Sequence, residues 1–151
     1  MPTSRHIFLQ IDTEGLLKEM GTSPAPTNAQ VRQYTLIGDQ GSLAMGNQIE
    51  NFSIGINPQE DLHFSIMPMK IFSYHILYFT EFRVVDYRDI TIPGEVVVDP
   101  HTLSFKVEVT DGEPGGYAQF NLFATLEYND GNSLISVPIC IDPMLRIKQL
   151  R

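Results

Sequence analysis

The chain has 151 residues, of which 42% are hydrophobic and 19% are charged. No segment combines low hydrophobicity with dense charge, so we expect one folded domain spanning residues 1–151. The 18 acidic and 10 basic residues give a formal net charge of -8, and the basic residues are scattered along the chain. A nucleic-acid partner is therefore not expected, because it would require clustered positive charge.

The beginning of the chain does not have the pattern of an export signal. Residues 1–15 contain one basic residue, and Gln10 and Asp12 interrupt the apolar stretch that follows it. No part of the chain approaches the ~18 consecutive apolar residues of a membrane-spanning helix. Cys140 is the only cysteine, which excludes an intramolecular disulfide. We therefore expect a cytoplasmic protein with no membrane partner.

The N-terminal segment is predicted to form one strand followed by one short helix. Residues 6–11 (HIFLQI) have the composition of a short buried strand. Asp12 or Thr13 can then cap a helical turn in residues 13–20, because a short polar side chain accepts hydrogen bonds from the first helical N–H groups. Residues 21–30 contain two prolines among small polar residues and are predicted to be a loop.

From residue 31 the hydrophobic pattern changes to a period of two, which is typical of strands with one buried face. The side chains predicted to share a buried face are Phe52, Ile54 and Ile56 in one strand and Leu62, Phe64 and Ile66 in the next. Residues 71–79 (IFSYHILYF) are apolar on both faces and rich in β-branched and aromatic side chains. This composition favours the central strand of a sheet.

The C-terminal third predicts a meander of three strands. In residues 102–109 every second side chain from Leu103 to Val109 is apolar, and residues 117–128 alternate in the same way. Residues 111–116 (DGEPGG), which lie between these two segments, are predicted to be a turn-rich loop.

The third strand of the meander is predicted at residues 134–141, after a hairpin turn at Asp130-Gly131. Pro138 cannot donate a ladder hydrogen bond, so it should lie at a sheet edge or a bulge, and Asp142-Pro143 should end the strand. The whole pattern predicts an all-β fold, an antiparallel β-sandwich of jelly-roll or immunoglobulin-like type with one short N-terminal helix.

No group of residues has the pattern of a catalytic or metal site. Cys140, two residues before Asp142, is flanked by isoleucines, so we interpret it as a strand cysteine. No two of His6, His63, His75 and His101 are closer than 12 residues, which argues against zinc. The acidic pairs Glu60-Asp61 and Asp86 with Asp89 lack any accompanying motif and are interpreted as solvated. We predict no catalytic residues, no metal and no cofactor.

Polar groups beside aromatic rings at the predicted loop tips suit a carbohydrate, since a sugar stacks on a ring while polar groups orient its hydroxyls. The candidate ligand-binding residues are Asp111, Tyr117, Tyr128, Asn129, Asp130 and Asn132. Their alternative role is turn formation, which Asn and Asp favour wherever they occur in tight loops.

Both ends of the chain resemble one protein family. The N-terminal strand leads into Asp12-Thr13-Glu14, then Leu16-Leu17 and a proline-containing loop (SPAPTN), and the last strand leads into Asp142-Pro143. This arrangement is similar to the AidA/PixA family of bacterial inclusion-body proteins. The resemblance implies a small bacterial β-sandwich made under growth-phase or quorum-sensing control and packed, in some members, into cytoplasmic inclusions.

The resemblance supplies no catalytic residues, and we interpret Asp12, Thr13, Asp142 and Pro143 as structural positions. The first functional hypothesis is therefore a non-enzymatic protein whose partner is itself, as a homodimer or a larger assembly. The second hypothesis is a lectin-like module that binds carbohydrate at the loop tips of the sandwich. Light scattering and a glycan screen would distinguish the two.

Overall fold

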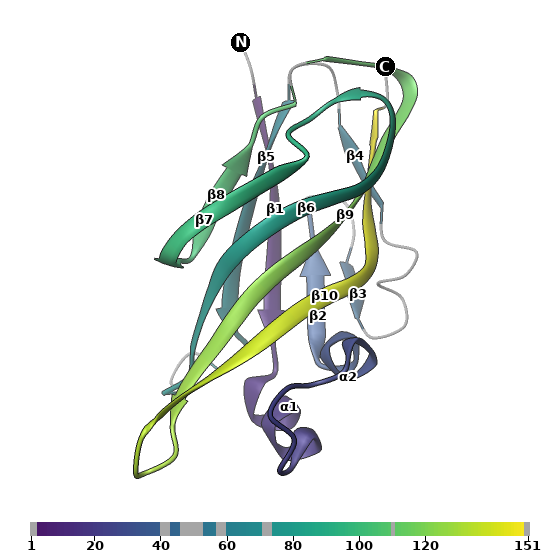
Figure 1. The fold of residues 1–151 in the computed structure, drawn as a ribbon. Coiled ribbons are helices and arrows are strands. Elements are labelled where there is room, and N and C mark those ends of the chain that lie inside the picture. The colour runs from purple at the N-terminus through teal and green to yellow at the C-terminus, as the bar shows by residue number, and fades with distance from the viewer. Residues whose placement is uncertain are drawn as a thin grey trace.

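The computed structural model describes residues 3–39, 43–45, 53–56, 60–70, 74–109 and 111–149, which form two five-stranded sheets and two short helices (Figure 1). The strands of the first sheet, in spatial order, are β3 (Leu43–Met45), β2 (Thr35–Gly38), β1 (Thr3–Ile11), β5 (Glu60–Pro68) and β8 (Ser104–Val107). Those of the second are β4 (Ser53–Ile56), β10 (Leu134–Gln149), β9 (Asp111–Asn129), β6 (Ile76–Thr91) and β7 (Glu95–Thr102).

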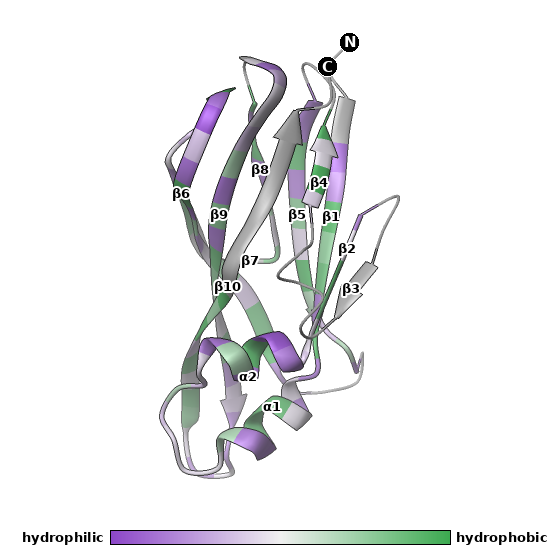
Figure 2. Cartoon of the chain, turned by 90° about the vertical axis from the view of Figure 1, so that its right-hand side faces the viewer, coloured by the Kyte–Doolittle hydropathy of each residue, from purple (hydrophilic) through white to green (hydrophobic). Residues whose placement is uncertain are grey.

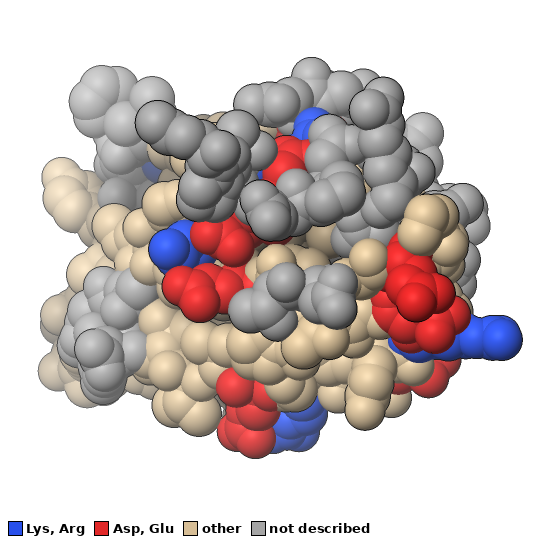
Figure 3. All heavy atoms as spheres, turned by 90° about the horizontal axis from the view of Figure 1, so that it is seen from above, with Lys and Arg blue, Asp and Glu red and all other residues tan. Residues whose placement is uncertain are grey.

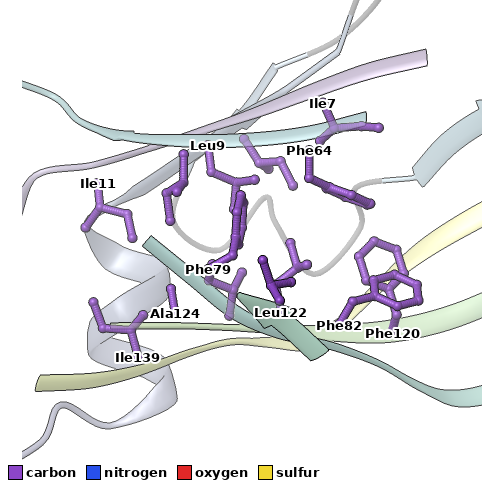
Figure 4. Close-up of a cluster of buried hydrophobic side chains, with 14 of the residues drawn as sticks. Ile7, Leu9, Ile11, Phe64, Phe79, Phe82, Phe120, Leu122, Ala124 and Ile139 are labelled. Atoms are coloured by element: carbon purple, nitrogen blue, oxygen red, sulfur yellow. The ribbon is translucent and has the colours of Figure 1, made fainter. Parts of the chain in front are cut away.

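The two sheets face each other across one hydrophobic core, so the predicted all-β sandwich is confirmed. Figure 4 shows Leu9 and Phe64 of the first sheet pointing toward Phe79, Phe82 and Leu122 of the second. Most neighbouring strands are antiparallel as predicted, but β1 pairs with β5 and β10 with β4 in parallel. Bands of hydrophobic and hydrophilic residues alternate along β5 and β9 (Figure 2), as the period-two pattern requires.

Most of the predicted buried faces are confirmed. Leu62, Phe64 and Ile66 of β5 are buried, and so are Ile54 and Ile56 of β4, while Phe52 lies outside the described residues. The core is rich in aromatic contacts, in which the Phe64 ring lies 5.2–5.9 Å from the centroids of its aromatic neighbours Phe82, Phe105 and Phe120. These rings join β5 and β8 of one sheet to β6 and β9 of the other.

Two helices, α1 (Thr13–Met20) and α2 (Asn28–Gln33), cover one end of the sandwich (Figure 2). The helix predicted at residues 13–20 is confirmed as α1. α2 is a second helix that was not predicted, and it shortens the predicted loop, which ends at Thr27. Thr27 accepts a hydrogen bond from the backbone of Gln30, whose side chain accepts one from the backbone of Thr27. This reciprocal pair starts α2 directly after the prolines. In the described residues no helix is long and apolar enough to cross a bilayer.

The strand predicted at residues 71–79 starts later and runs further than expected. β6 begins at Ile76 and ends at Thr91, and residues 71–73 lie outside the described part of the chain. β6 lies between β9 and β7, so the central position of the second sheet belongs to β9. Three register shifts along the β6–β9 pairing let these two long strands bend together.

The predicted loop at residues 111–116 is wrong, because β9 begins at Asp111 and pairs with the end of β6. The glycines of this segment lie where the pairing of β6 with β9 is irregular. Gly115 has φ 85°, and Asp89, opposite it on β6, has φ 54°. A Cβ on Gly116 would overlap the backbone carbonyl of Asp89. Glycine is therefore used here for close strand contact, a role that a turn-rich composition does not reveal.

The predicted meander of three strands is also wrong. Ser104–Val107 forms β8, which pairs with β5 in the first sheet, whereas β9 and β10 pair in the second. Leu103, predicted to be buried, is 55% exposed because it lies where the chain crosses from β7 to β8. The hairpin turn at Asp130-Gly131 is confirmed, with φ 99° at Gly131.

β10 continues past Asp142-Pro143 to Gln149, so the predicted strand end is wrong. A register shift between Ile141 and Leu145 accommodates the proline, and Arg146, Ile147 and Lys148 then pair with both β9 and β4. Before the shift, the described part of β10 pairs with β9 alone, so Pro138 lies on an unpaired strand edge as predicted.

Candidate functional site

The hairpin tip between β9 and β10 uses its polar side chains to hold its own turn. Asn129 Oδ1 accepts a hydrogen bond from the backbone N–H of Gly131 at 2.8 Å. Asp130 Oδ1 accepts hydrogen bonds from the backbone N–H groups of Ser133 and Asn132, each at 2.9 Å. These two backbone donors hold the pKa of Asp130 below its usual value. The predicted ligand-binding oxygens are therefore engaged in turn formation.

Of the remaining carbohydrate candidates, Tyr128 lies beside this tip, whereas Tyr117 and Asp111 lie away from it on β9. The Tyr117 hydroxyl donates to Asp86 Oδ2 at 3.2 Å. Asp111 pairs with Thr91, and its side chain lies outside the described part of the chain. Tyr117 and Tyr128 are eleven residues apart on β9, which corresponds to about 37 Å in an extended strand. The candidates therefore fall at two places that are far apart.

The motif residues Asp12 and Thr13 lie at the start of α1. Asp12 Oδ1 accepts a hydrogen bond from the backbone N–H of Gly15 at 3.1 Å and caps the helix. The Thr13 hydroxyl is 2.6 Å from His75 Nδ1, and the His75 and Tyr128 rings pack edge to face with centroids 6.0 Å apart. Thr13 is only 2% exposed, so this pair joins α1 to the second sheet and does not present a hydroxyl to a substrate.

A pocket of about 330 Å³ lies on the outer face of the second sheet, beside the start of α2. It is lined by Ala25, Pro26, Asn28, Thr80, Phe123, Ala124, Thr125, Pro138, Ile139 and Cys140. No histidine is among these residues. His63 follows the buried Leu62 on β5 and lies on the outer face of the first sheet. Cys140 and His63 are thus on opposite faces of the sandwich, so they do not form a nucleophile–base pair.

The sequence-adjacent acids Glu60 and Asp61 point to opposite faces of β5. Glu60 is buried and lies 3.5 Å from the Arg5 guanidinium, whereas Asp61 lies 3.8 Å from the Lys106 ammonium. Figure 3 shows acidic side chains in separate groups next to basic ones on the face it presents. Among the residues that the structure describes, the acidic side chains on this face do not form one continuous cluster.

A different acidic pair, which the sequence pattern does not reveal, joins β6 to β7. The Glu95 carboxyl group hydrogen-bonds Glu81, which raises the pKa of Glu95 and lowers that of Glu81. The Arg83 guanidinium donates to both Glu81 oxygens at 2.9 and 2.8 Å and lies 5.2 Å from the centre of the Phe123 ring. The two glutamates are 14 residues apart and are brought together by the pairing of β6 with β7.

On one side of the molecule both sheets end in the strands β7 and β8, which we call the β7–β8 side (Figure 1). Within the described residues, β7 pairs only with β6, and β8 only with β5. This side exposes apolar side chains, since Val97 is 75% exposed and Leu103 is 55% exposed. It is the candidate interaction surface of the molecule.

No protein-family model and no curated protein sequence matches this chain. Among solved structures, the crystal structure of an inclusion body protein (PixA) from Burkholderia cenocepacia J2315 is similar, with a TM-score of 0.57 and 12% sequence identity. The similarity covers 99% of this chain and 96% of that one. The resemblance predicted from the two chain ends is thereby confirmed at the level of the fold, over nearly the whole chain.

Proposed function

We propose that this chain is a non-enzymatic, cytoplasmic protein that self-associates in the manner of an inclusion-body protein. The observation that carries the proposal is the β7–β8 side, where both sheets end in strand edges beside exposed apolar side chains. The likeness to the PixA structure supports it, because that protein is an inclusion body protein. Production under growth-phase or quorum-sensing control belongs to the same proposal and rests on the family resemblance.

The free edge of β7 provides the main contact in this proposal. Its outward N–H and C=O groups have the spacing of a sheet ladder, so they can pair with the same strand of a second copy. A two-fold axis beside β7 would place the two copies antiparallel and join their second sheets into one continuous sheet. Glu95 at the start of β7 places a negative charge near the contact in both copies.

The exposed apolar side chains add a second contribution. Burying one valine or leucine side chain contributes roughly 1.5–3 kcal/mol. A two-fold contact buries the same residue in both copies. Association costs roughly 4–15 kcal/mol in lost translational and rotational freedom. Burial of Val97 and Leu103 in both copies does not cover the upper end of that cost. The balance, together with backbone hydrogen bonds, favours weak assembly that depends on protein concentration.

The geometry elsewhere supports binding in preference to catalysis. The Thr13 hydroxyl is buried against His75, and Cys140 and His63 lie on opposite faces. The polar groups of the hairpin tip hold their own turn, so the lectin-like alternative gains no support from the arrangement of these residues.

The test is the substitution Val97→Lys, which places a charge on the edge of β7 and should oppose strand pairing. We expect the wild-type mass to rise with concentration in light scattering, and the variant to stay monomeric at concentrations where the wild type assembles. Leu134→Lys is the matched control, because Leu134 is 63% exposed but lies next to the β9–β10 turn.

Two results would contradict the proposal. One is a wild type that stays monomeric over the full concentration range at several salt concentrations. The other is assembly that survives Val97→Lys and is lost in Leu134→Lys, which would move the contact to the hairpin.

A further inference from the structure

Two histidines that are 57 residues apart in the sequence are neighbours on the outer face of the first sheet. The parallel pairing of β1 with β5 places His6 directly opposite His63. Their rings are stacked, with centroids 5.1 Å apart and an angle of 24° between the planes. His6 is exposed and His63 is half-buried, so both rings can be reached from solvent.

The ring nitrogens of this pair are available. Neither ring makes a hydrogen bond with another residue in the part of the chain that the structure describes, in contrast to His75, which contacts Thr13. Lys106 on β8 lies opposite His63 in the pairing of β5 with β8. Carboxylates of Asp61 and Glu108 lie 3.8 and 3.6 Å from its ammonium group and partly neutralise it. The pair therefore sits in a setting that tolerates a bound cation.

We infer that His6 and His63 form a two-ligand site for a divalent late transition metal, with Cu²⁺ bound more tightly than Zn²⁺ or Ni²⁺. Neutral imidazole is a good ligand for these ions, and their affinities for nitrogen sites follow that order. Mg²⁺ prefers oxygen ligands and should not bind. The parallel register, and not the spacing in the sequence, creates the site.

The distance between the rings suits one shared ion. With a metal–nitrogen bond of about 2.1 Å, the ion lies roughly 3.2 Å from the centre of each imidazole ring. For ring centres 5.1 Å apart, the angle at the ion between the two rings is then roughly 105°. The stacked rings must turn about χ2 to converge, and the exposed His6 ring has the freedom to do so. The described residues contain no group of three or more ligands, so water completes the coordination.

The experiment is titration of the whole chain with Cu²⁺, Zn²⁺ and Mg²⁺ by calorimetry, with electron paramagnetic resonance of the Cu²⁺ complex. We expect one bound ion per chain and no binding of Mg²⁺. His6→Gln and His63→Gln should each weaken binding by at least about tenfold. The copper spectrum should show two imidazole nitrogens in the wild type and one in each variant.

Lys106→Gln is the matched control, since it changes a neighbouring cation on the same face without removing a ligand, and it should bind at least as well as the wild type. Cys140→Ser should also bind as the wild type does, which separates this site from the thiol on the other sheet. The inference is overturned if both histidine variants bind like the wild type, or if the wild type binds none of these ions. Circular dichroism checks that each variant is folded.

Discussion

Single residues decide where the long strands of this sandwich can bend. Asp89 and Gly115 have positive φ values of 54° and 85°, and Gly116 leaves the space that the Asp89 carbonyl occupies. Only a residue without Cβ fits at Gly116, because any side chain would overlap backbone atoms that cannot move independently. The composition of residues 111–116 indicates glycine's freedom, but the partner strand determines how it is used.

Gly116→Ala is therefore expected to destabilise the protein. The added Cβ must push β9 away from β6, and overpacking of this kind costs roughly 1–3 kcal/mol. Gly94→Ala is the matched control, because a Cβ there meets no atom within 4 Å. Urea unfolding followed by circular dichroism measures both free energies. Equal stability of the two variants would contradict this account of the bulge.

Local sequence patterns do not predict contacts between residues that are far apart in the chain. His6 with His63, Thr13 with His75, and Glu81 with Glu95 each lie on strands or caps that meet only in the folded molecule. Sequence spacing correctly indicates that no metal motif is local, yet it carries no information on parallel strand register.

Among the elements, the start of α2 has a capping-box pattern in its sequence, but the prolines just before it favour a loop. Thr27 and Gln30 have the spacing of a capping box, whereas the prolines at 24 and 26 favour a loop. Both signals are correct, because the loop ends where the capping box begins. α2 then packs beside β10. In the residues that the structure describes, the first half of β10 pairs with β9 and has no strand on its other side.

Removing the cap tests how much α2 depends on it. Thr27→Ala deletes the oxygen that accepts from Gln30 N–H and should lower the free energy of unfolding by about 0.5–2 kcal/mol. Thr27→Ser keeps the oxygen and should stay close to the wild type. Thermal unfolding of the three proteins provides the comparison, and an alanine variant as stable as the serine variant would show that packing on β10 alone holds α2.

β10 shows how a proline can bend a strand without ending it. Pro138 lies on an edge, as its missing N–H requires, but Pro143 lies where the register shifts and the strand then gains β4 as a neighbour. Asp-Pro therefore marks an irregularity in this chain, which a sequence pattern does not distinguish from a strand end.

For the whole molecule, the net charge of -8 opposes the proposed self-association. Salt screens this repulsion, since the Debye length falls from roughly 30 Å at about 0.01 M to roughly 3 Å at about 1 M. Acidification toward the isoelectric point of 4.8 removes charge from both copies. Glu95 on the β7 edge has a raised pKa, so it takes up a proton at higher pH than an ordinary glutamate.

We therefore expect assembly to increase with salt and as the pH falls from about 8 toward 4.8. Glu95→Gln removes the edge charge at every pH and should assemble more strongly at neutral pH, with a weaker dependence on pH. Light scattering across a salt and pH grid measures both effects. Assembly that weakens with salt would indicate attraction between opposite charges as the main contact.

The sequence by itself determined the buried faces of β4, β5 and the second part of β9, because side-chain alternation is a local consequence of extended backbone. It also determined the β9–β10 hairpin, since the Asp130-Gly131 turn and its flanking strands are adjacent in the chain. The resemblance of the chain ends indicated the fold that the PixA structure shares.

Only the tertiary structure decided which sheet each strand joins, which strands pair in parallel, and which edges remain free. Those choices depend on contacts between residues far apart in the chain, such as β1 with β5 and β8 with β5. Local pattern cannot specify them, because a strand with one apolar face satisfies the same hydrophobic burial in either sheet. The His6–His63 pair and the β7–β8 side both arise from these long-range choices.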